Sequence, residues 1–336
     1  MKKLGITIIL AAALSSNSAA ALPIRQDIDK SMTPELKSFN PDLGISIEGG
    51  TTGLGIGLES QLNDLFQVRT SFTWMPHFEF PMHFNIQVGD GKPDYDDQGR
   101  SRFDRMAGYL EEMTGFKIDQ QVDMIGVPHF YNFKLLVDVF PFKDKRWYFT
   151  AGFYAGPSVI GKAYNRTEDM TTLMSVAMYN NIYFKVDDME NNPDSQIDGV
   201  FLGLKLPPQV KNRILEAGRM GMRVGDFKDG SPYMMEPDQD NMVKAEMKVN
   251  AFRPYIGTGY KGLIDRNNDR LKFSFDCGVM FWGGAPKVYA QPGTDQETEI
   301  MGLDNIIGQV GRYTDVAKRF KVFPLLNLSI SYTLFK

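Results

Sequence analysis

Residues 323–335 read Phe-Pro-Leu-Leu-Asn-Leu-Ser-Ile-Ser-Tyr-Thr-Leu-Phe, and this stretch decides the fold. From Leu326 to Leu334 every second side chain is apolar, whereas the residues between them are Asn, Ser, Ser and Thr. A period of two residues is typical of a β-strand with one apolar and one polar face. The stretch is longer than the 5–6 residues typical of a globular strand and long enough for the roughly 9–11 that cross a bilayer.

The same alternation recurs along the chain, in segments 53–62, 65–75, 130–140, 146–157 and 270–283. In each segment, none of the alternate positions that make up the apolar face is occupied by a charged residue. The opposite faces carry glycines, small polar residues and six charged residues, namely Glu59, Arg69, Lys134, Asp138, Lys272 and Asp276. Three carboxylates thus balance three cations, and in a small closed barrel such side chains would pair and fill the interior. A barrel of about eight strands has room for little else, which argues against a wide pore.

Alternation alone also fits a soluble β-sandwich. Strand length favours a membrane barrel, as do aromatic residues near the expected strand ends, such as Trp74, Trp147 and Phe281. In hydrocarbon every backbone N–H must be paired, so strands there must close into a barrel. We therefore predict an all-β protein, a closed antiparallel transmembrane β-barrel of about eight strands, with ten as the alternative. A secreted sandwich stays open as the soluble alternative.

The eight predicted strands are separated by short turns on one rim and long connections on the other, the arrangement of outer-membrane barrels. Short polar turns fall at 61–65, 142–145 and 264–269. The long external loops are 90–127, 163–246 and 285–321. The sixth strand loses its alternation near Phe252-Arg253-Pro254, which predicts a bulge or an edge defect there. The strands are placed at 43–50, 52–62, 65–88, 128–141, 146–161, 247–262, 269–284 and 322–335.

The N-terminus has the order of a secretory signal peptide. Lys2 and Lys3 precede the apolar run 4–14, and Ala19-Ala20-Ala21 fits the small-x-small cleavage rule. We expect a signal peptide at 1–21, a periplasmic segment at 22–42 and the barrel at 43–336. Removal of two lysines from a chain with 37 Lys+Arg and 41 Asp+Glu leaves a formal charge of −6. This balance excludes a nucleic-acid binder, and the single Cys excludes an intrachain disulfide and a Cys-based zinc site.

The long loops contain helical periodicity. Apolar residues at helical spacing predict helices over 102–116, 207–220 and 297–320. Loop 163–246 carries nine Lys/Arg and fourteen Asp/Glu, and with Met247 it holds ten of the nineteen methionines. A methionine-rich surface can adapt to a ligand, so this loop is the candidate surface-binding region. The alternative is that these methionines fill gaps where helices pack.

Five blocks together carry a family resemblance: GTTGLGIGLESQLNDLFQVRTSF, NFKLLVDVFPFKDKRWYFTAGFYAG, RPYIGTGYKG, LKFSFDCGVMFWGGAPKV and FPLLNLSISYTLF. They resemble the strand-turn-strand blocks of small outer-membrane β-barrel proteins of Bacteroidota type, and more widely the OmpA-like membrane domain and porin-like barrels. The resemblance implies a last strand ending in an aromatic residue that the barrel insertion machinery recognises. Here Phe335 is penultimate and Lys336 is last, a departure from that pattern. The resemblance implies no reaction and no catalytic residue.

No catalytic, cofactor-binding or metal site is predicted. The GxGxxG pattern at 257–262 and the P-loop-like pattern at 156–162 lack the following helix and the Ser/Thr that those motifs need. His77, Glu79 and His83 share one parity of a strand and could meet at its outer end, as a metal site or, with Ser71 or Thr73, as a lipid-modifying site. The simpler interpretation is that these histidines lie at the rim and form hydrogen bonds with the loops.

The expected function is that of an integral outer-membrane barrel with a filled lumen and a structural or surface-binding role through its loops. The expected partners are outer-membrane lipid and lipopolysaccharide, which acidic clusters at 94–97 and 187–190 could bind through divalent cations. A narrow porin-like channel and an envelope-lipid-modifying enzyme are the alternatives. No cofactor is expected, and the chain is not expected to be an enzyme.

Overall fold

The computed structural model of the protein describes residues 42–335 apart from short gaps. The gaps are 91, 93, 192–199, 202–203, 206–207, 228, 296, 301–305, 308–318 and 320. The predicted signal peptide at 1–21 and nearly all of the predicted segment 22–42 lie outside the described residues.

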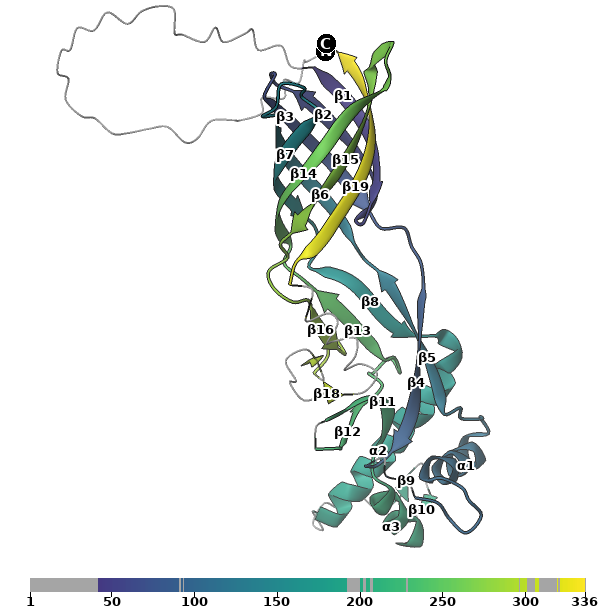
Figure 1. Ribbon diagram of the computed structural model, residues 1–336. Helices are drawn as coiled ribbons and strands as arrows, with labels where there is room; N and C mark the ends of the chain where they lie inside the picture. Colours follow the sequence, from purple (N-terminus) through teal and green to yellow (C-terminus); the bar gives the residue numbers. More distant parts are fainter. Residues whose placement is uncertain are drawn as a thin grey trace, which may run out of the picture. The chain divides into compact units, whose positions relative to one another are not determined.

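The barrel is closed and consists of eight strands, each antiparallel to both of its neighbours (Figure 1). Its order is β1-β19-β15-β14-β7-β6-β3-β2, and β2 returns to β1. The predicted closed antiparallel barrel is confirmed, with eight strands rather than ten. The strands are β1 (Leu43–Gly50), β2 (Gly53–Gln61), β3 (Phe66–Trp74), β6 (Tyr131–Val139), β7 (Trp147–Ala155), β14 (Phe252–Asp265), β15 (Asn268–Met280) and β19 (Phe323–Phe335).

Three short turns join barrel strands at one rim, at 62–65, 140–146 and 266–267. In the first, the Asn63 side chain accepts the backbone N–H groups of Leu65 and Phe66, which fixes the tight reversal. The strand β1 begins and the strand β19 ends at this rim, so the described ends of the chain lie together there (Figure 1).

Four predicted strands are too long, because they run through junctions at the other rim. The predicted strand 65–88 splits into β3 and β4 (Phe80–Val88), and β4 lies outside the barrel. The same correction applies to 128–141, 146–161 and 247–262, which extend past barrel strands β6, β7 and β14 toward other elements. Pro76 and Pro157 lie in two of the junctions, where a residue without an N–H cannot continue a ladder. At this rim the barrel strands are therefore connected by 75–130, 156–251 and 281–322, longer stretches than the predicted loops, and β1 and β2 are joined by the short turn 51–52.

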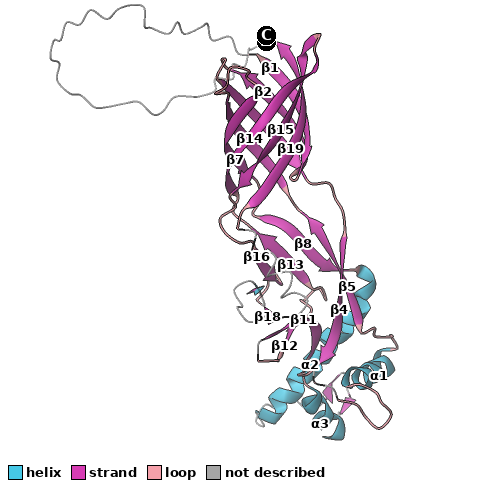
Figure 2. Ribbon diagram, in the orientation of Figure 1, coloured by secondary structure: helices cyan, strands magenta, loops and turns pink. Residues whose placement is uncertain are grey.

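These connections build a second sheet, which the sequence did not predict (Figure 2). Its order is β12-β11-β4-β5-β8-β13-β16-β17, with β18 paired to β11. Backbone hydrogen bonds such as Met75 N–H to Phe130 O and Val249 N–H to Ser158 O continue the pairing through the junctions. The new strands are β5 (Gln121–Pro128), β8 (Val159–Asn165), β11 (Met220–Phe227), β12 (Pro232–Met235), β13 (Lys244–Lys248), β16 (Lys287–Ala290), β17 (Thr298–Glu299) and β18 (Ile306–Ile307); β9 (Val200–Phe201) and β10 (Leu204–Lys205) form a separate pair.

Helices pack on this sheet, and two of the three predicted helices are confirmed. Helix α1 (Arg102–Thr114) begins at a capping box in which Ser101 and Asp104 satisfy each other's backbone N–H groups, and it ends at Gly115 with φ 74°. Helix α3 (Pro208–Ala217) begins at Pro208, as predicted. The third prediction, 297–320, is wrong at β17 and β18, which are strands, and its remaining residues lie almost wholly outside those described.

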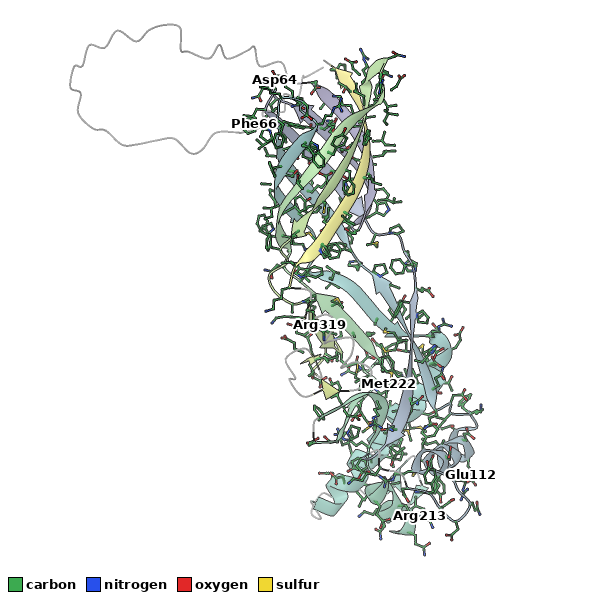
Figure 3. All side chains as sticks on the ribbon, viewed as in Figure 1. Asp64, Phe66, Glu112, Arg213, Met222 and Arg319 are labelled. Atoms are coloured by element: carbon green, nitrogen blue, oxygen red, sulfur yellow. The ribbon has the colours of Figure 1, made fainter. Side chains whose placement is uncertain are left out.

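The longest helix, α2 (Met170–Asn191), was not predicted. Its buried residues include Leu173, Val176, Tyr179 and Ile182, and these join Phe84, Ile86 and Met222 of the sheet in one apolar core. The methionines Met220, Met222 and Met235 are buried in this core, so they act as packing residues rather than as an exposed patch. Figure 3 shows the side chains of both regions, with Phe66 on the barrel and Met222 on the second sheet.

The predicted bulge near 252–254 is wrong. Phe252, Arg253 and Pro254 pair in unbroken register with Ala155, Tyr154 and Phe153 of β7. The irregularity of β14 lies instead between Leu263 and Asp265, next to the turn.

Candidate functional site: the barrel wall and lumen

The outer wall of the barrel is apolar and exposed. On β19 the even-numbered residues face outward, and Leu328 is 62% exposed, whereas the inward Ser329 is 7% exposed. Phe273 and Ile330 are cross-strand partners on this wall, and both are exposed. Exposed apolar residues over closed strands are unfavourable in water and favourable in hydrocarbon. The fold is accordingly a transmembrane β-barrel, and Cys277 lies exposed on its wall.

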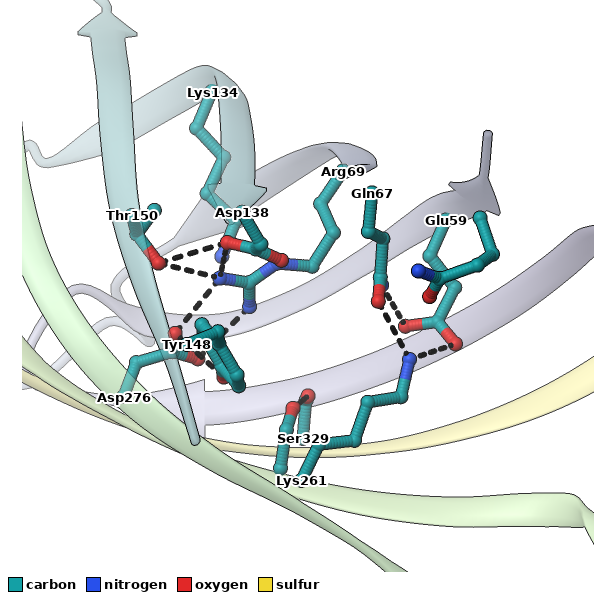
Figure 4. A network of polar contacts seen from close by, with 12 residues as sticks. Glu59, Gln67, Arg69, Lys134, Asp138, Tyr148, Thr150, Lys261, Asp276 and Ser329 are labelled. Atoms are coloured by element: carbon teal, nitrogen blue, oxygen red, sulfur yellow. Dashed lines mark hydrogen bonds and ion pairs between the residues drawn. The ribbon is translucent and has the colours of Figure 1, made fainter. Parts of the chain in front are cut away.

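At the centre of the lumen, Arg69 of β3 binds two carboxylates (Figure 4). Its guanidinium donates to both oxygens of Asp276, at 2.9 and 2.7 Å, and to Asp138 at 2.8 Å. Thr150 donates to Asp138 at 2.7 Å and Tyr148 donates to Asp276 at 2.9 Å. Each carboxylate thus accepts hydrogen bonds from Arg69 and from a hydroxyl group, and the planar guanidinium suits such two-sided recognition. Arg69, Asp138 and Asp276 are hereafter called the central cluster.

A second ion pair lies toward the short-turn rim. Lys261 donates to Glu59 at 3.0 Å and to Gln67 at 2.9 Å, and Gln67 donates to the other oxygen of Glu59 at 3.1 Å (Figure 4). Three side chains from three strands thus close a ring of polar contacts across the lumen.

The third ion pair joins Lys134 to Glu48. Ser71 and Asn327 also donate to Glu48, at 2.5 and 2.8 Å. All four side chains are buried. A buried ion pair persists where further hydrogen bonds support it, and here both carboxylate oxygens of Glu48 accept hydrogen bonds.

Near the junction rim, Arg253 fills the barrel end and is fully buried. It donates to the carbonyls of Asn250 at 2.7 Å and Pro157 at 2.5 Å, contacts Asn132, and lies over the ring of Phe130 at 5.3 Å. Apolar residues complete this end: Phe130, Leu136, Tyr154, Tyr255, Met280 and Leu325 form a buried cluster. The lumen is therefore occupied along its length by paired charges and packed rings.

Glycines make room for tyrosine rings in the lumen. A Cβ on Gly259 would lie 2.3 Å from the ring of Tyr148, and one on Gly257 would lie 2.3 Å from the hydroxyl oxygen of Tyr255. No side chain fits at these positions, so the glycines of the inner face are required by close approach.

Five of the six charges predicted to face inward are paired in the lumen: Arg69, Asp138 and Asp276 with one another, and Glu59 and Lys134 with Lys261 and Glu48. The exception is Lys272, which lies near the short-turn rim, 3.9 Å from Asp42. Sequence reasoning missed Glu48, Lys261 and Arg253. On β14 every second residue from Arg253 through Tyr255 to Lys261 faces inward. Following this alternation along the strand would have identified Arg253 and Lys261.

His77, Glu79 and His83 do not form one site in the structure. His77 and Glu79 are exposed and 3.9 Å apart, in the junction between β3 and β4. His83 lies on β4, where its Nδ1 is 2.6 Å from Asp123, and this interaction lowers the pKa of Asp123. Ser71 binds Glu48 in the lumen and Thr73 is buried there, so neither is paired with a histidine. Among the residues that the structure describes, no group of three His, Cys, Asp or Glu could hold a metal ion.

The acidic cluster 94–97 is largely neutralised by neighbouring arginines. Asp94 binds Arg102 and Arg105, and Asp96 binds Arg100. The Arg105 side chain lowers the pKa of Asp94, and the backbone N–H of Arg100, followed by its side chain, lowers the pKa of Asp96. These contacts leave less free charge for a bridging cation than the sequence suggests. In the described part of the chain, no helix is long and apolar enough to span a membrane.

No protein-family model matches the chain, and no curated protein matches it. Solved structures give weak matches. CarO2 and CarO of Acinetobacter baumannii are 13% and 12% identical, with TM-scores of 0.36 and 0.34; each match covers 87% of this chain, and 98% and 97% of those chains. A major outer membrane protein of Thermus thermophilus is 10% identical with a TM-score of 0.28, over 88% of this chain and 99% of that one. The strand pairing of this chain by itself establishes the closed barrel.

Proposed function

We propose that the protein is an integral outer-membrane β-barrel whose filled lumen does not conduct, and that its second sheet and helices serve a structural or surface-binding role. The observation that carries this proposal is the reversed polarity of the barrel. Its exposed wall is apolar, while Arg69, Asp138 and Asp276 are buried together inside it. Water as the outer solvent would favour the opposite arrangement.

The second sheet is proposed to lie outside the cell. Three of the four short turns share one rim with the described chain ends, and in barrels of this class this is the periplasmic rim. The strands that leave the opposite rim carry the second sheet. Lipid and lipopolysaccharide are the proposed neighbours, and strand β19 is the proposed signal for the insertion machinery. Kinship with OmpA-like barrels of Bacteroidota is part of the same proposal.

Membrane fractionation tests the location. The protein should enter the outer-membrane fraction and require detergent for extraction, and its folded form should migrate differently from the boiled form on a gel. Protease added to intact cells should cleave within 163–246 and leave the barrel strands protected. Recovery in the soluble fraction without detergent would reject the proposal.

A narrow channel is the second candidate, and the central cluster argues against it. Ions would have to pass Arg69 while it stays bound to two carboxylates. Purified wild-type protein in planar bilayers should therefore show no conductance steps. If protein that is shown to be folded by its heat-modifiable mobility produces conductance steps, the result would favour the channel.

An enzyme that modifies envelope lipid is the third candidate, and the His83–Asp123 pair is the feature that could serve it. We propose that this pair is not catalytic. The variants His83→Ala and His77→Ala should leave the lipid A composition of intact cells unchanged. A change with His83→Ala alone would support the enzyme.

A further inference from the structure

The inner face of the second sheet carries a row of very small residues near the barrel. Gly126 of β5 pairs with Ala163 of β8, and Ala163 pairs with Ala245 of β13. Gly161 lies two residues from Ala163 and therefore on the same face. A Cβ on Gly126 or Gly161 would meet no heavy atom closer than 3.4 Å, so space remains above this row.

Large apolar side chains surround the row and leave a cavity of about 360 Å³. Phe80 and Met82 come from one side of the row, and Met247 and Val288 come from the other. Val224 of β11 and Met235 of β12 line the same cavity, although these strands stand at the other end of the sheet from β16. The sheet therefore curls around the cavity. The volume falls within the range of about 300–1,000 Å³ that is typical of small-molecule sites.

The cavity adjoins the packed core of the same sheet. Phe84 of β4 borders the cavity and also belongs to this core, which Ile86 and Val88 continue toward helices α1 and α2. Lys162 and Glu246 border the cavity, but strand parity directs their side chains to the opposite face, where they lie 3.9 Å apart. The residues lining the cavity therefore offer a hydrocarbon surface with flexible methionines, which suits an apolar chain better than a charged ligand.

The mouth of the cavity lies close to the membrane. Phe78 and Phe80 border it and are 53% and 52% exposed. Phe78 follows Trp74, the last residue of β3 and an exposed residue of the barrel wall, by four residues. Four residues span at most about 14 Å, so the mouth lies within reach of the headgroup layer.

We propose that this cavity binds one acyl chain of a membrane lipid from the adjacent leaflet, with the lipid headgroup outside the cavity. The inference rests on the proposed transmembrane placement of the barrel. The acyl chain would enter from the membrane at the mouth of the cavity and cover the apolar surface of the curled sheet. No covalent step is involved. The cavity-filling variant Ala163→Phe should exclude the chain, because its ring would occupy the space above the row.

The test is native mass spectrometry of detergent-purified full-length protein with dimyristoylphosphatidylcholine as the probe. Wild type should retain one lipid, and Ala163→Phe should weaken binding about tenfold or more. Ile125→Phe is the matched control, because Ile125 pairs with Tyr164 on the opposite face of the same strands; it should bind as wild type does. Ala245→Phe replaces Ala163→Phe if the latter does not show heat-modifiable mobility.

Equal lipid binding by wild type and both cavity variants would overturn the inference, since the bound lipid would then be annular. Binding of palmitate without binding of the phospholipid would also overturn it, because the source would be a free fatty acid. Membrane fractionation keeps the two proposals separate. A membrane-inserted protein with unchanged lipid binding in the variants rejects the cavity alone, whereas a soluble protein rejects the proposed function.

Discussion

The barrel and the second sheet are both built from strands of two-residue period, but they turn their apolar faces to opposite sides. In the barrel, Ile330 and Phe273 face outward, and Arg69 and Asp276 are buried. In the second sheet, Ile86 and Met222 are buried against helices, and polar residues such as His83 are on the exposed face. The periodicity identifies a strand, and the surrounding solvent decides which face is buried.

The largest expected effect comes from breaking the central cluster. Arg69→Leu would leave Asp138 and Asp276 buried without their cation, which should lower the free energy of unfolding by about 3–5 kcal/mol. Urea titration of the heat-modifiable band in detergent would measure the change. Lys117→Leu, which removes an exposed ion pair with Asp119, is the control and should have no measurable effect. An unchanged Arg69→Leu midpoint would mean that the cluster contributes nothing to barrel stability.

The core of the second sheet should respond as a water-soluble core does. Met222 is fully buried, so Met222→Ala should destabilise this region by about 2–5 kcal/mol through lost burial and a residual cavity. Limited proteolysis should show faster cleavage within 163–246, while the barrel keeps its folded gel mobility. Met174→Ala, at a largely exposed position of helix α2, should leave the cleavage rate unchanged. Loss of the folded barrel band in Met222→Ala would show that the two regions do not unfold separately.

Glycines distinguish the two regions more finely. Gly259→Ala would place a Cβ 2.3 Å from Tyr148 in the full lumen and should cost about 1–3 kcal/mol. Gly161→Ala would meet nothing closer than 3.8 Å in the hollow part of the second sheet and should change stability by no more than about 0.5 kcal/mol. Paired urea titrations would compare the two variants. Equal effects would contradict the contrast between a filled lumen and a hollow sheet.

The smallest expected effect concerns pH. The contact with His83 lowers the pKa of Asp123, so its contribution to stability is present above the ordinary aspartate pKa of about 4 and is lost as the pH falls through the lower folded value. His83→Ala should raise the pKa of Asp123 toward its ordinary value, which carboxyl NMR titration would detect. An unchanged titration would mean that Gln121, the other side chain bound to Asp123, maintains the shift.

Much of the barrel was predictable, because each of its strands has a single lipid-facing parity. The junctions were not: Phe80, Met82 and Phe84 continue the parity of Phe66–Trp74, although they face a cavity and a core rather than lipid. Helix α2 was missed because polar residues such as Ser175 and Asn180 are buried on its packed face while Met174 and Phe184 are exposed, which leaves no apolar stripe to detect. The ion pairs Glu48–Lys134 and Glu59–Lys261 join strands that are far apart in sequence. Only the closure of the barrel brings these strands together.

The central claim is that the even-numbered residues of β19 face lipid and the odd-numbered ones face the lumen. The direct test is a nitroxide scan over 326–331 in vesicles, with the single native cysteine, Cys277, replaced by Ser and each variant checked for heat-modifiable mobility. Collision with oxygen should be high at 326, 328 and 330 and low at 327, 329 and 331. High oxygen accessibility at the odd positions, or no alternation, would contradict the account.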